Sequence, residues 1–156
     1  MSKSIARVEQ AASDAGMAIE IRRMGESTRT AAEAAEQCGC VVAQIVKSLI
    51  FLGKDSGRLY LFLVAGDRQL DLAKAAALAG EALGRADPRQ IRDETGFAIG
   101  GVSPIGHKID IPCFADRRLL DFATVWAAAG AHDAVFEADP SALVRAAGAT
   151  VADISA

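Results

Sequence analysis

The chain of 156 residues contains few aromatic or cysteine side chains and no long apolar run. Aromatic residues make up 5% of the sequence, and the three cysteines, Cys38, Cys40 and Cys113, are an odd number. An odd number argues for reduced thiols rather than a disulfide framework. No run of 18 apolar residues occurs, and the N-terminus lacks the apolar segment of a signal peptide. We therefore expect a cytoplasmic protein without a membrane partner.

The common motifs of metal-dependent, nucleotide-dependent and covalent catalysis are also missing. Cys38 and Cys40 are separated by one residue, whereas paired zinc ligands usually have about two to four residues between them. The two histidines, His107 and His132, lie far apart in sequence. GxxxxGK[ST], GxGxxG and HExxH do not occur, and residues 101–105 fail the GxSxG pattern at its last position. We therefore expect no metal and no cofactor.

The charge of the chain is slightly negative. Its formal net charge is −3, so the surface as a whole does not attract nucleic acid. The first 58 residues hold eight basic and seven acidic side chains, whereas the chain from Lys108 onward holds four basic and seven acidic ones. Any phosphate contact must therefore be local, with candidates Arg22, Arg23, Arg29 and Lys47. An ordinary solvated surface explains the same charges.

The length and the apolar content of 51% suit a single compact domain over residues 1–156. Five segments begin at a capping residue and end at a glycine, which predicts helices. They run from Ser4 to Gly16, Thr30 to Gly39, Asp71 to Gly80, Asp87 to Gly96 and Asp139 to Gly148. Thr30 and Glu33 are spaced as a capping box, and a proline follows Asp87 and Asp139 at the first helical position.

Apolar runs between these helices predict strands. They cover residues 18–21, 46–52, 59–65, 97–100, 110–115, 124–128, 134–138 and 150–154. Residues 53–57, GKDSG, predict a hairpin turn, and a short helix is expected at residues 117–120. Strands joined by short turns pair in antiparallel fashion. We therefore predict an α/β fold of the α+β type, with a mixed, largely antiparallel curved sheet surrounded by helices.

Two features stand out from this background. Lys47 opens a predicted strand beside apolar residues, so its side chain either extends to the rim of the sheet or binds an anion. Residues 100–107, GGVSPIGH, contain three glycines, which permit positive φ and close approach of a ligand. Pro104 holds Ser103 extended. Such a loop either directs amide N–H groups toward one point, as an oxyanion site requires, or merely turns the chain.

Both features lie in segments that resemble the signatures of the YbaK / prolyl-tRNA-editing family. These segments are QIVKSLIF, residues 44–51, and GFAIGGVSPIGH, residues 96–107. The stretches DRQLDLAKAAALAG and STRTAAEAAEQCG, the ADP at residues 86–88 and the C-terminal region also resemble the family. The similarity covers the chain from about residue 5 onward, as in a free-standing member.

The resemblance implies a metal-independent hydrolase that deacylates mischarged tRNA-Pro and has a YbaK-like fold. Lys47 matches the family's lysine, which would hold the phosphate of the terminal adenosine or polar groups of the substrate. Gly100 and Pro104 match the GxxxP loop, which would hold the aminoacyl group through its backbone. By this match the catalytic candidates are Lys47, Gly100 and Gly101. The substrate-binding candidates are Val102, Ser103, Pro104, Ile105, Gly106, His107, Arg29 and Thr30.

This chemistry requires few side chains. An aminoacyl ester is already reactive, so a positioned water and donors for the developing carbonyl charge suffice, and the neighbouring ribose hydroxyl can assist. We expect the Lys47 ammonium to lie near residues 100–104. The expected partner is the acceptor end of aminoacyl-tRNA, tRNA-Pro carrying alanine, cysteine, 2-aminobutyrate, serine or threonine, with prolyl-tRNA synthetase as a further candidate. Two alternatives stay open: a non-catalytic tRNA- or protein-binding module of the same fold, and an esterase for small molecules.

Overall fold

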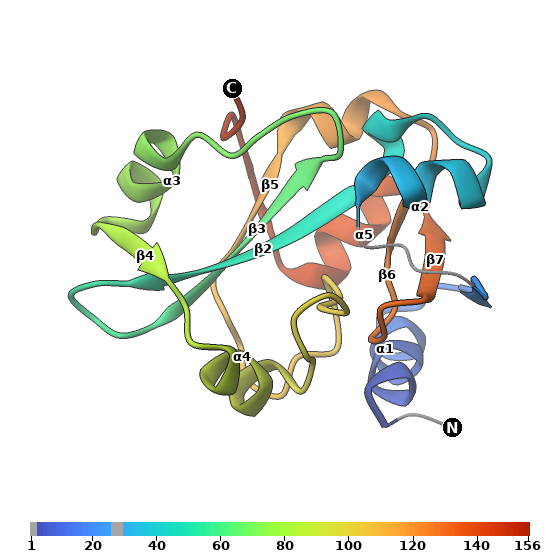
Figure 1. Cartoon of the computed structure of the whole chain (residues 1–156), viewed down its shortest axis with the longest axis horizontal. Helices are drawn as coiled ribbons and strands as arrows, with labels where there is room; N and C mark the ends of the chain where they lie inside the picture. Colours follow the sequence, from blue (N-terminus) through green and yellow to red (C-terminus); the bar gives the residue numbers. More distant parts are fainter. Residues whose placement is uncertain (1–2, 26–29) are drawn as a thin grey trace.

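The computed structural model describes residues 3–25 and 30–156, which form helices packed around two β-sheets (Figure 1). The α-helices are α1 (Lys3–Asp14), α2 (Ala31–Cys38), α3 (Leu72–Ala79), α4 (Pro88–Thr95) and α5 (Pro140–Ala147). Two 3-10 helices, η1 (Val42–Gln44) and η2 (Arg117–Asp121), lie between strands. No helix in these two ranges is long and apolar enough to cross a membrane.

Four of the five predicted helix caps are confirmed, whereas the cap predicted at Ser4 is wrong, because α1 begins at Lys3 and already includes Ser4. The Thr30–Glu33 capping box is formed, and the side chains of Asp71, Asp87 and Asp139 accept backbone N–H groups of the first turns. The four helices with these caps end at glycines in the left-handed conformation, Gly39, Gly80, Gly96 and Gly148. Local capping chemistry therefore sets where the chain leaves α2, α3, α4 and α5.

The larger sheet has five strands in the order β4-β2-β3-β5-β8. Its strands are β2 (Val46–Gly53), β3 (Leu59–Ala65), β4 (Leu83–Arg85), β5 (Cys113–Asp116) and β8 (Thr150–Ala152). β2 pairs with β3 and β4 in antiparallel fashion, whereas the β3–β5 and β5–β8 pairs are parallel. The predicted hairpin is confirmed, because the Gly53 N–H donates to the Arg58 carbonyl at 2.8 Å.

The smaller sheet contains β1 (Ile21–Arg23), β7 (Ala134–Ala138) and β6 (Val125–Ala128) in that order, and both pairs are antiparallel. A single parallel bridge, Ile45 to Trp126, connects it to the start of β2. The predicted class of mixed, largely antiparallel sheet with surrounding helices is confirmed, with the strands divided between two sheets rather than one.

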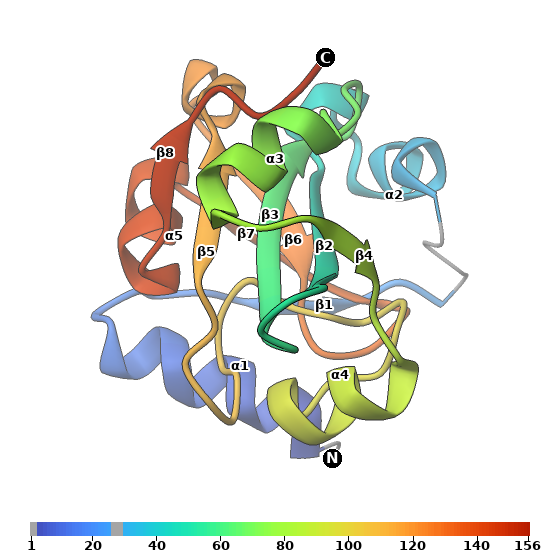
Figure 2. The same ribbon diagram turned by 90° about the vertical axis from the view of Figure 1, so that its left-hand side faces the viewer.

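β3 lies at the centre of the larger sheet, and all seven of its residues are buried. Leu61 and Leu63 belong to the main core cluster, whereas Phe62 and Val64 pack in a second cluster with Ala75 of α3. Figure 2 shows α3 lying across this second face of the sheet. Burial on both faces explains why the sequence of β3 is an unbroken apolar run.

Three strand predictions differ from the structure. The first strand lies at residues 21–23 rather than at the predicted residues 18–21. The strand predicted at residues 97–100 is wrong: the Phe97 N–H donates to the Thr95 hydroxyl, and Gly100 has a φ of 95°, so the chain turns there. The apolar character of this segment comes instead from Phe97, which is fully buried in the core. The sequence prediction also missed β4, whose three residues, with Gly84 in the middle, carry too little pattern to show alternation.

Candidate active site

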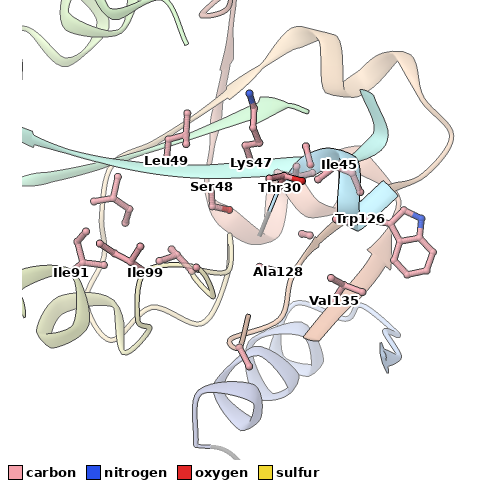
Figure 3. Close-up of a pocket in the computed structure, with 18 of the residues that line it drawn as sticks. Thr30, Ile45, Lys47, Ser48, Leu49, Ile91, Ile99, Trp126, Ala128 and Val135 are labelled. Carbon is pink, nitrogen blue, oxygen red and sulfur yellow. The ribbon is translucent and has the colours of Figure 1, made fainter. Parts of the chain in front are cut away.

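A cavity of about 450 Å³ lies beside the middle of β2, between the two sheets (Figure 3). Its walls come from β2, β6, β7, the end of β4, the first turn of α2, α4 and the loop after α4. Most of the lining is aliphatic. Lys47 and Arg85 are the charged residues that line it, and no Asp or Glu of the described chain does so. The aliphatic lining therefore suits a small acyl group, and the two positive charges favour an anion beside it over a cation.

The cavity occupies a gap along one edge of β2. β3 pairs with one edge of β2 along residues 46–52, whereas β4 pairs with the other edge only at residues 51–53. At the opposite end, β6 meets the chain only through the bridge between Ile45 and Trp126. Between these two contacts the edge of β2 has no partner strand in the described chain, and the cavity opens there.

The register of β2 determines which backbone groups face this gap. In an antiparallel ladder, alternate residues direct their N–H and C=O groups to the same neighbour. The Gly53 N–H donates toward β3, to Arg58, and the Lys54 N–H donates toward β4, to Ala82. The even-numbered residues therefore face away from β3. It follows that the N–H and C=O groups of Ser48 point into the gap.

Ser48 is a residue of the cavity lining that the sequence interpretation missed. Its hydroxyl oxygen is buried without a hydrogen-bond partner, the single such side-chain atom found within residues 3–25 and 30–156. Figure 3 shows the Ser48 side chain on the opposite side of β2 from Lys47, as strand alternation requires. A serine within the apolar run VKSLIFL was the available signal. A buried polar atom without a partner marks a place where a ligand can supply the missing hydrogen bond.

The Lys47 ammonium does not lie beside the loop, so the expected position near residues 100–104 is wrong. It donates a hydrogen bond to the carbonyl oxygen of Arg68 after β3, and Figure 3 shows it pointing away from Ser48 and Ile99. The reason is strand alternation, which places Lys47 on the far side of β2 from Ser48. Burial lowers the pKa of Lys47, and the negative charge of Asp67 opposes this shift. Lys47 nevertheless belongs to the cavity lining.

The loop after α4, residues 97–107, is called the signature loop because it lies in the second family signature. Its first part, the front, contributes Ile99, Gly100 and Val102 to the cavity. Gly100 has a φ of 95°, and a Cβ added there would meet no protein atom within 4 Å. Gly101 is packed instead: an added Cβ would lie 2.9 Å from the Cα of Ala131, and its N–H donates to Ala98 O at 3.0 Å. Of the predicted catalytic glycines, Gly100 therefore faces the cavity and Gly101 supports it.

The second part of the signature loop, residues 103–107, does not line this cavity. Ser103 is fully buried, and its hydroxyl accepts the Ile105 N–H at 3.3 Å. The four remaining loop residues among the predicted substrate contacts line a second cavity of about 420 Å³, together with residues of α1 and α5. They are Pro104, Ile105, Gly106 and His107. The structure thus brings Lys47, Gly100, Val102 and Thr30 to one cavity, but not residues 103–107.

The remaining candidates at the rim have mostly structural partners. Thr30 lines the cavity, but its hydroxyl accepts the Glu33 N–H and donates to the Glu33 carboxylate, so it fixes the start of α2. The guanidinium of Arg22 lies 5.0 Å from the centre of the Trp126 ring, and Arg23 forms a 3.0 Å ion pair with Asp133. The predicted substrate contact Arg29 lies outside the described residues.

The cysteine thiols are poor nucleophiles. Burial raises the pKa of Cys113 to about 12 and is the main cause that raises the pKa of Cys38 to about 11. Thiols with such values stay protonated near neutral pH and react slowly. In the part of the chain that the structure describes, no three His, Cys, Asp or Glu side chains gather where they could hold a metal ion.

A family profile and several known proteins are similar to this chain. The sequence profile of the aminoacyl-tRNA editing domain matches residues 25–146. YwhH, an uncharacterized protein of Bacillus subtilis, is 32% identical over 80% of this chain and 78% of its own length. A proline–tRNA ligase of Acidithiobacillus ferrooxidans is 33% identical over 85% of this chain, which spans only 23% of the ligase. EbsC of Enterococcus faecalis, a proposed Cys-tRNA(Pro)/Cys-tRNA(Cys) deacylase, is 26% identical over 83% of this chain and 79% of its own length.

The fold leads to the same group. A crystal structure described as a proposed trans-editing enzyme for prolyl tRNA synthetase superposes with a TM-score of 0.92 at 46% identity, over 100% of this chain and 99% of its own. The family profile and the similar proteins identify an aminoacyl-tRNA deacylase. The chain belongs to the aminoacyl-tRNA editing family.

Proposed function

We propose that this chain hydrolyses the ester of tRNA-Pro that carries a small non-cognate amino acid. The observation that carries the proposal is the aliphatic cavity of about 450 Å³, which joins an unpaired edge of β2 to a glycine-containing loop. Support also comes from EbsC, whose name gives Cys-tRNA(Pro) as a substrate, and from the structure described as acting for prolyl tRNA synthetase. Because a ligase contains a similar segment, prolyl-tRNA synthetase is the proposed source of the mischarged substrate.

In the proposed reaction, backbone groups stabilise the carbonyl oxygen and a water attacks the carbonyl carbon. Water addition gives a tetrahedral intermediate whose oxyanion needs donors at about 2.7–3.1 Å. The amide N–H of Ser48, which the β2 register directs into the gap, is a candidate donor together with those of Gly100 and Val102. Collapse breaks the bond to the ribose oxygen, which takes up a proton. The products are the free amino acid and uncharged tRNA.

The two cations of the lining are proposed to bind the nucleotide end of the substrate. Arg85 and Lys47 line the cavity without an acidic neighbour in its wall. A phosphate oxygen is a stronger acceptor for an ammonium than a neutral carbonyl is. We therefore propose that Lys47 exchanges its hydrogen bond with Arg68 O for one with the terminal phosphate of the bound tRNA.

Selection among acyl groups is proposed to depend on shape. Apart from Trp126, the lining residues of β6, β7 and the turn between them have short side chains, namely Ala127, Ala128, Ala131 and Val135. An apolar pocket distinguishes one methylene by only about 1–3 kcal/mol, but a rigid wall can exclude a ring altogether. Alanine, cysteine, 2-aminobutyrate, serine and threonine are the proposed acyl groups, and the pyrrolidine ring of proline is the group to be excluded.

A substrate panel tests this function. The chain is incubated with tRNA-Pro charged with alanine, cysteine or serine, and with p-nitrophenyl acetate as a generic ester, while binding of uncharged tRNA-Pro is measured in parallel. We expect release of the amino acid from at least one charged tRNA-Pro. Hydrolysis of the generic ester alone would favour the small-molecule esterase. Binding of tRNA without hydrolysis would favour a non-catalytic module.

A further inference from the structure

His107 lies behind the signature loop rather than in the cavity that the loop borders. Gly100 and Val102, at the front of the loop, line the cavity beside β2. His107 instead lines the second cavity, beside residues of α1 and α5. A side chain in this place cannot touch a substrate held against Ser48, although it belongs to the same loop.

The imidazole of His107 has a defined hydrogen bond. Its Nε2 lies 2.6 Å from the carbonyl oxygen of Ser103. Because a carbonyl oxygen only accepts, Nε2 must carry the hydrogen, and this contact selects the tautomer. The ring also meets Phe97 edge-on, with centroids 5.6 Å apart and an angle of 78° between the planes. Phe97 is fully buried, so the ring rests on an immobile neighbour.

This bond fixes a part of the loop that regular secondary structure leaves unsupported. Ser103 is fully buried, and its carbonyl belongs to the peptide bond that precedes Pro104. Its own hydroxyl accepts the Ile105 N–H, so residues 103–107 are closed by two side-chain hydrogen bonds. Ser103 directly follows Val102, which lines the cavity. A rotation of the Ser103 backbone would therefore move Val102.

We propose that His107 is a positioning residue of the editing reaction, which holds the Ser103 carbonyl through Nε2–H and thereby fixes Val102 and Gly100 against the bound ester. The inference rests on the proposed deacylase function. It gives His107 a role in the reaction without contact with the substrate. Loss of the bond should lower kcat, because displacement of reacting groups by about 1 Å can reduce a rate about 10²-fold. The KM should change little, because the Lys47 and Arg85 contacts remain.

Three substitutions separate the hydrogen bond from the volume of the ring. The amide nitrogen of Gln is the same number of bonds from Cα as Nε2, whereas that of Asn matches Nδ1. His107→Gln can therefore restore the bond to Ser103 O, whereas His107→Asn and His107→Ala cannot. Ile154→Val, a core truncation in the cluster on the α3 face of the sheet, serves as a control for loss of stability alone.

The experiment measures kcat and KM on alanyl-, cysteinyl- and seryl-tRNA-Pro, with the thermal unfolding of each variant. For the substrate that the wild type cleaves, we expect kcat to fall about 10²-fold in His107→Asn and His107→Ala, with His107→Gln and Ile154→Val within a few-fold of wild type. Wild-type kcat in His107→Asn or His107→Ala, or equal losses in all three His107 variants, would overturn the inference. Inactivity of the wild type on all three substrates would instead count against the proposed function.

A measurement on the wild type alone tests the His107 hydrogen bond if a variant fails to fold. Nitrogen-15 spectra of histidine-labelled protein distinguish an imidazole protonated at Nε2 from one protonated at Nδ1. We expect His107 in the Nε2–H form, with slow exchange of that hydrogen because the Ser103 carbonyl is buried. A neutral His107 protonated at Nδ1 would contradict the proposed bond.

Discussion

Replacement of Ser48 by alanine should stabilise the free protein and impair the enzyme. The Ser48 hydroxyl is buried without a partner in the free state. Leaving such a group unsatisfied costs about 1–3 kcal/mol, so its removal should raise the free energy of unfolding by about 1 kcal/mol. For a chain of this size that corresponds to about 2–4 °C in Tm. If the hydroxyl turns into the cavity to bond the bound acyl group, its loss should lower kcat/KM about 10-fold to 100-fold.

The matched control is Ser103→Ala, at a serine whose hydroxyl is also buried but has a hydrogen-bond partner. Its hydroxyl accepts the Ile105 N–H, so its removal leaves a donor without a partner and should lower Tm, with a milder effect on activity than Gly100→Ala. Deacylation by both variants is followed on alanyl-tRNA-Pro, and unfolding by calorimetry. The reasoning is refuted if Ser48→Ala lowers Tm as Ser103→Ala does, or if it leaves kcat/KM unchanged.

Three further perturbations probe the site and its support. Lys47→Ala should raise the KM for charged tRNA at least about 10-fold, with Tm within about 2 °C of wild type; an unchanged KM would remove Lys47 from the site. Gly100→Ala should lower kcat about 10²-fold through backbone strain at a φ of 95°, although the added methyl meets no protein atom within 4 Å; full activity would show that the loop tolerates the change. The Glu81 carboxylate accepts hydrogen bonds from the Ser56 N–H and hydroxyl and from Tyr60, which hold its pKa at about 2 rather than its ordinary 4.5. Because the folded pKa lies below the unfolded one, Glu81 stabilises the fold fully above pH 4.5 and loses this effect as the pH falls toward 2. The Tm values of wild type and Glu81→Gln should therefore converge across that range, and a constant difference would contradict this explanation.

Local chemistry made much of the fold predictable. The caps at Thr30, Asp71, Asp87 and Asp139 depend on residues a few positions away, so the sequence contains the whole signal. The hairpin of β2 and β3 is equally local. The division into two sheets was not predictable, because β6 meets the start of β2 only at the bridge between Ile45 and Trp126 and does not pair along it. Contacts between residues so distant in sequence leave no local pattern.

The candidate site also contains residues that the sequence identified and features that it could not show. Gly100 and Val102 were identified through a sequence resemblance, and the structure places both at the cavity. The direction of the Lys47 ammonium depends on the Arg68 carbonyl, which reaches it only once the turn after β3 is formed. Ser48 is visible in the sequence as a serine within the apolar run VKSLIFL, but its place at the cavity depends on β4 and β6, which leave the edge of β2 unpaired beside it. Such a gap depends on how β2, β4 and β6 are arranged together, so no local sequence pattern predicts it.

The central claim is that the chain removes small acyl groups from tRNA-Pro and spares proline. The most direct measurement compares the deacylation rates of alanyl-tRNA-Pro, 2-aminobutyryl-tRNA-Pro, cysteinyl-tRNA-Pro and prolyl-tRNA-Pro at one enzyme concentration, with the rates without enzyme subtracted. The wall of Ala127, Ala128 and Ala131 predicts hydrolysis of one or more of the small esters and a prolyl rate near the uncatalysed one. Prolyl hydrolysis as fast as that of the small esters would contradict the claim.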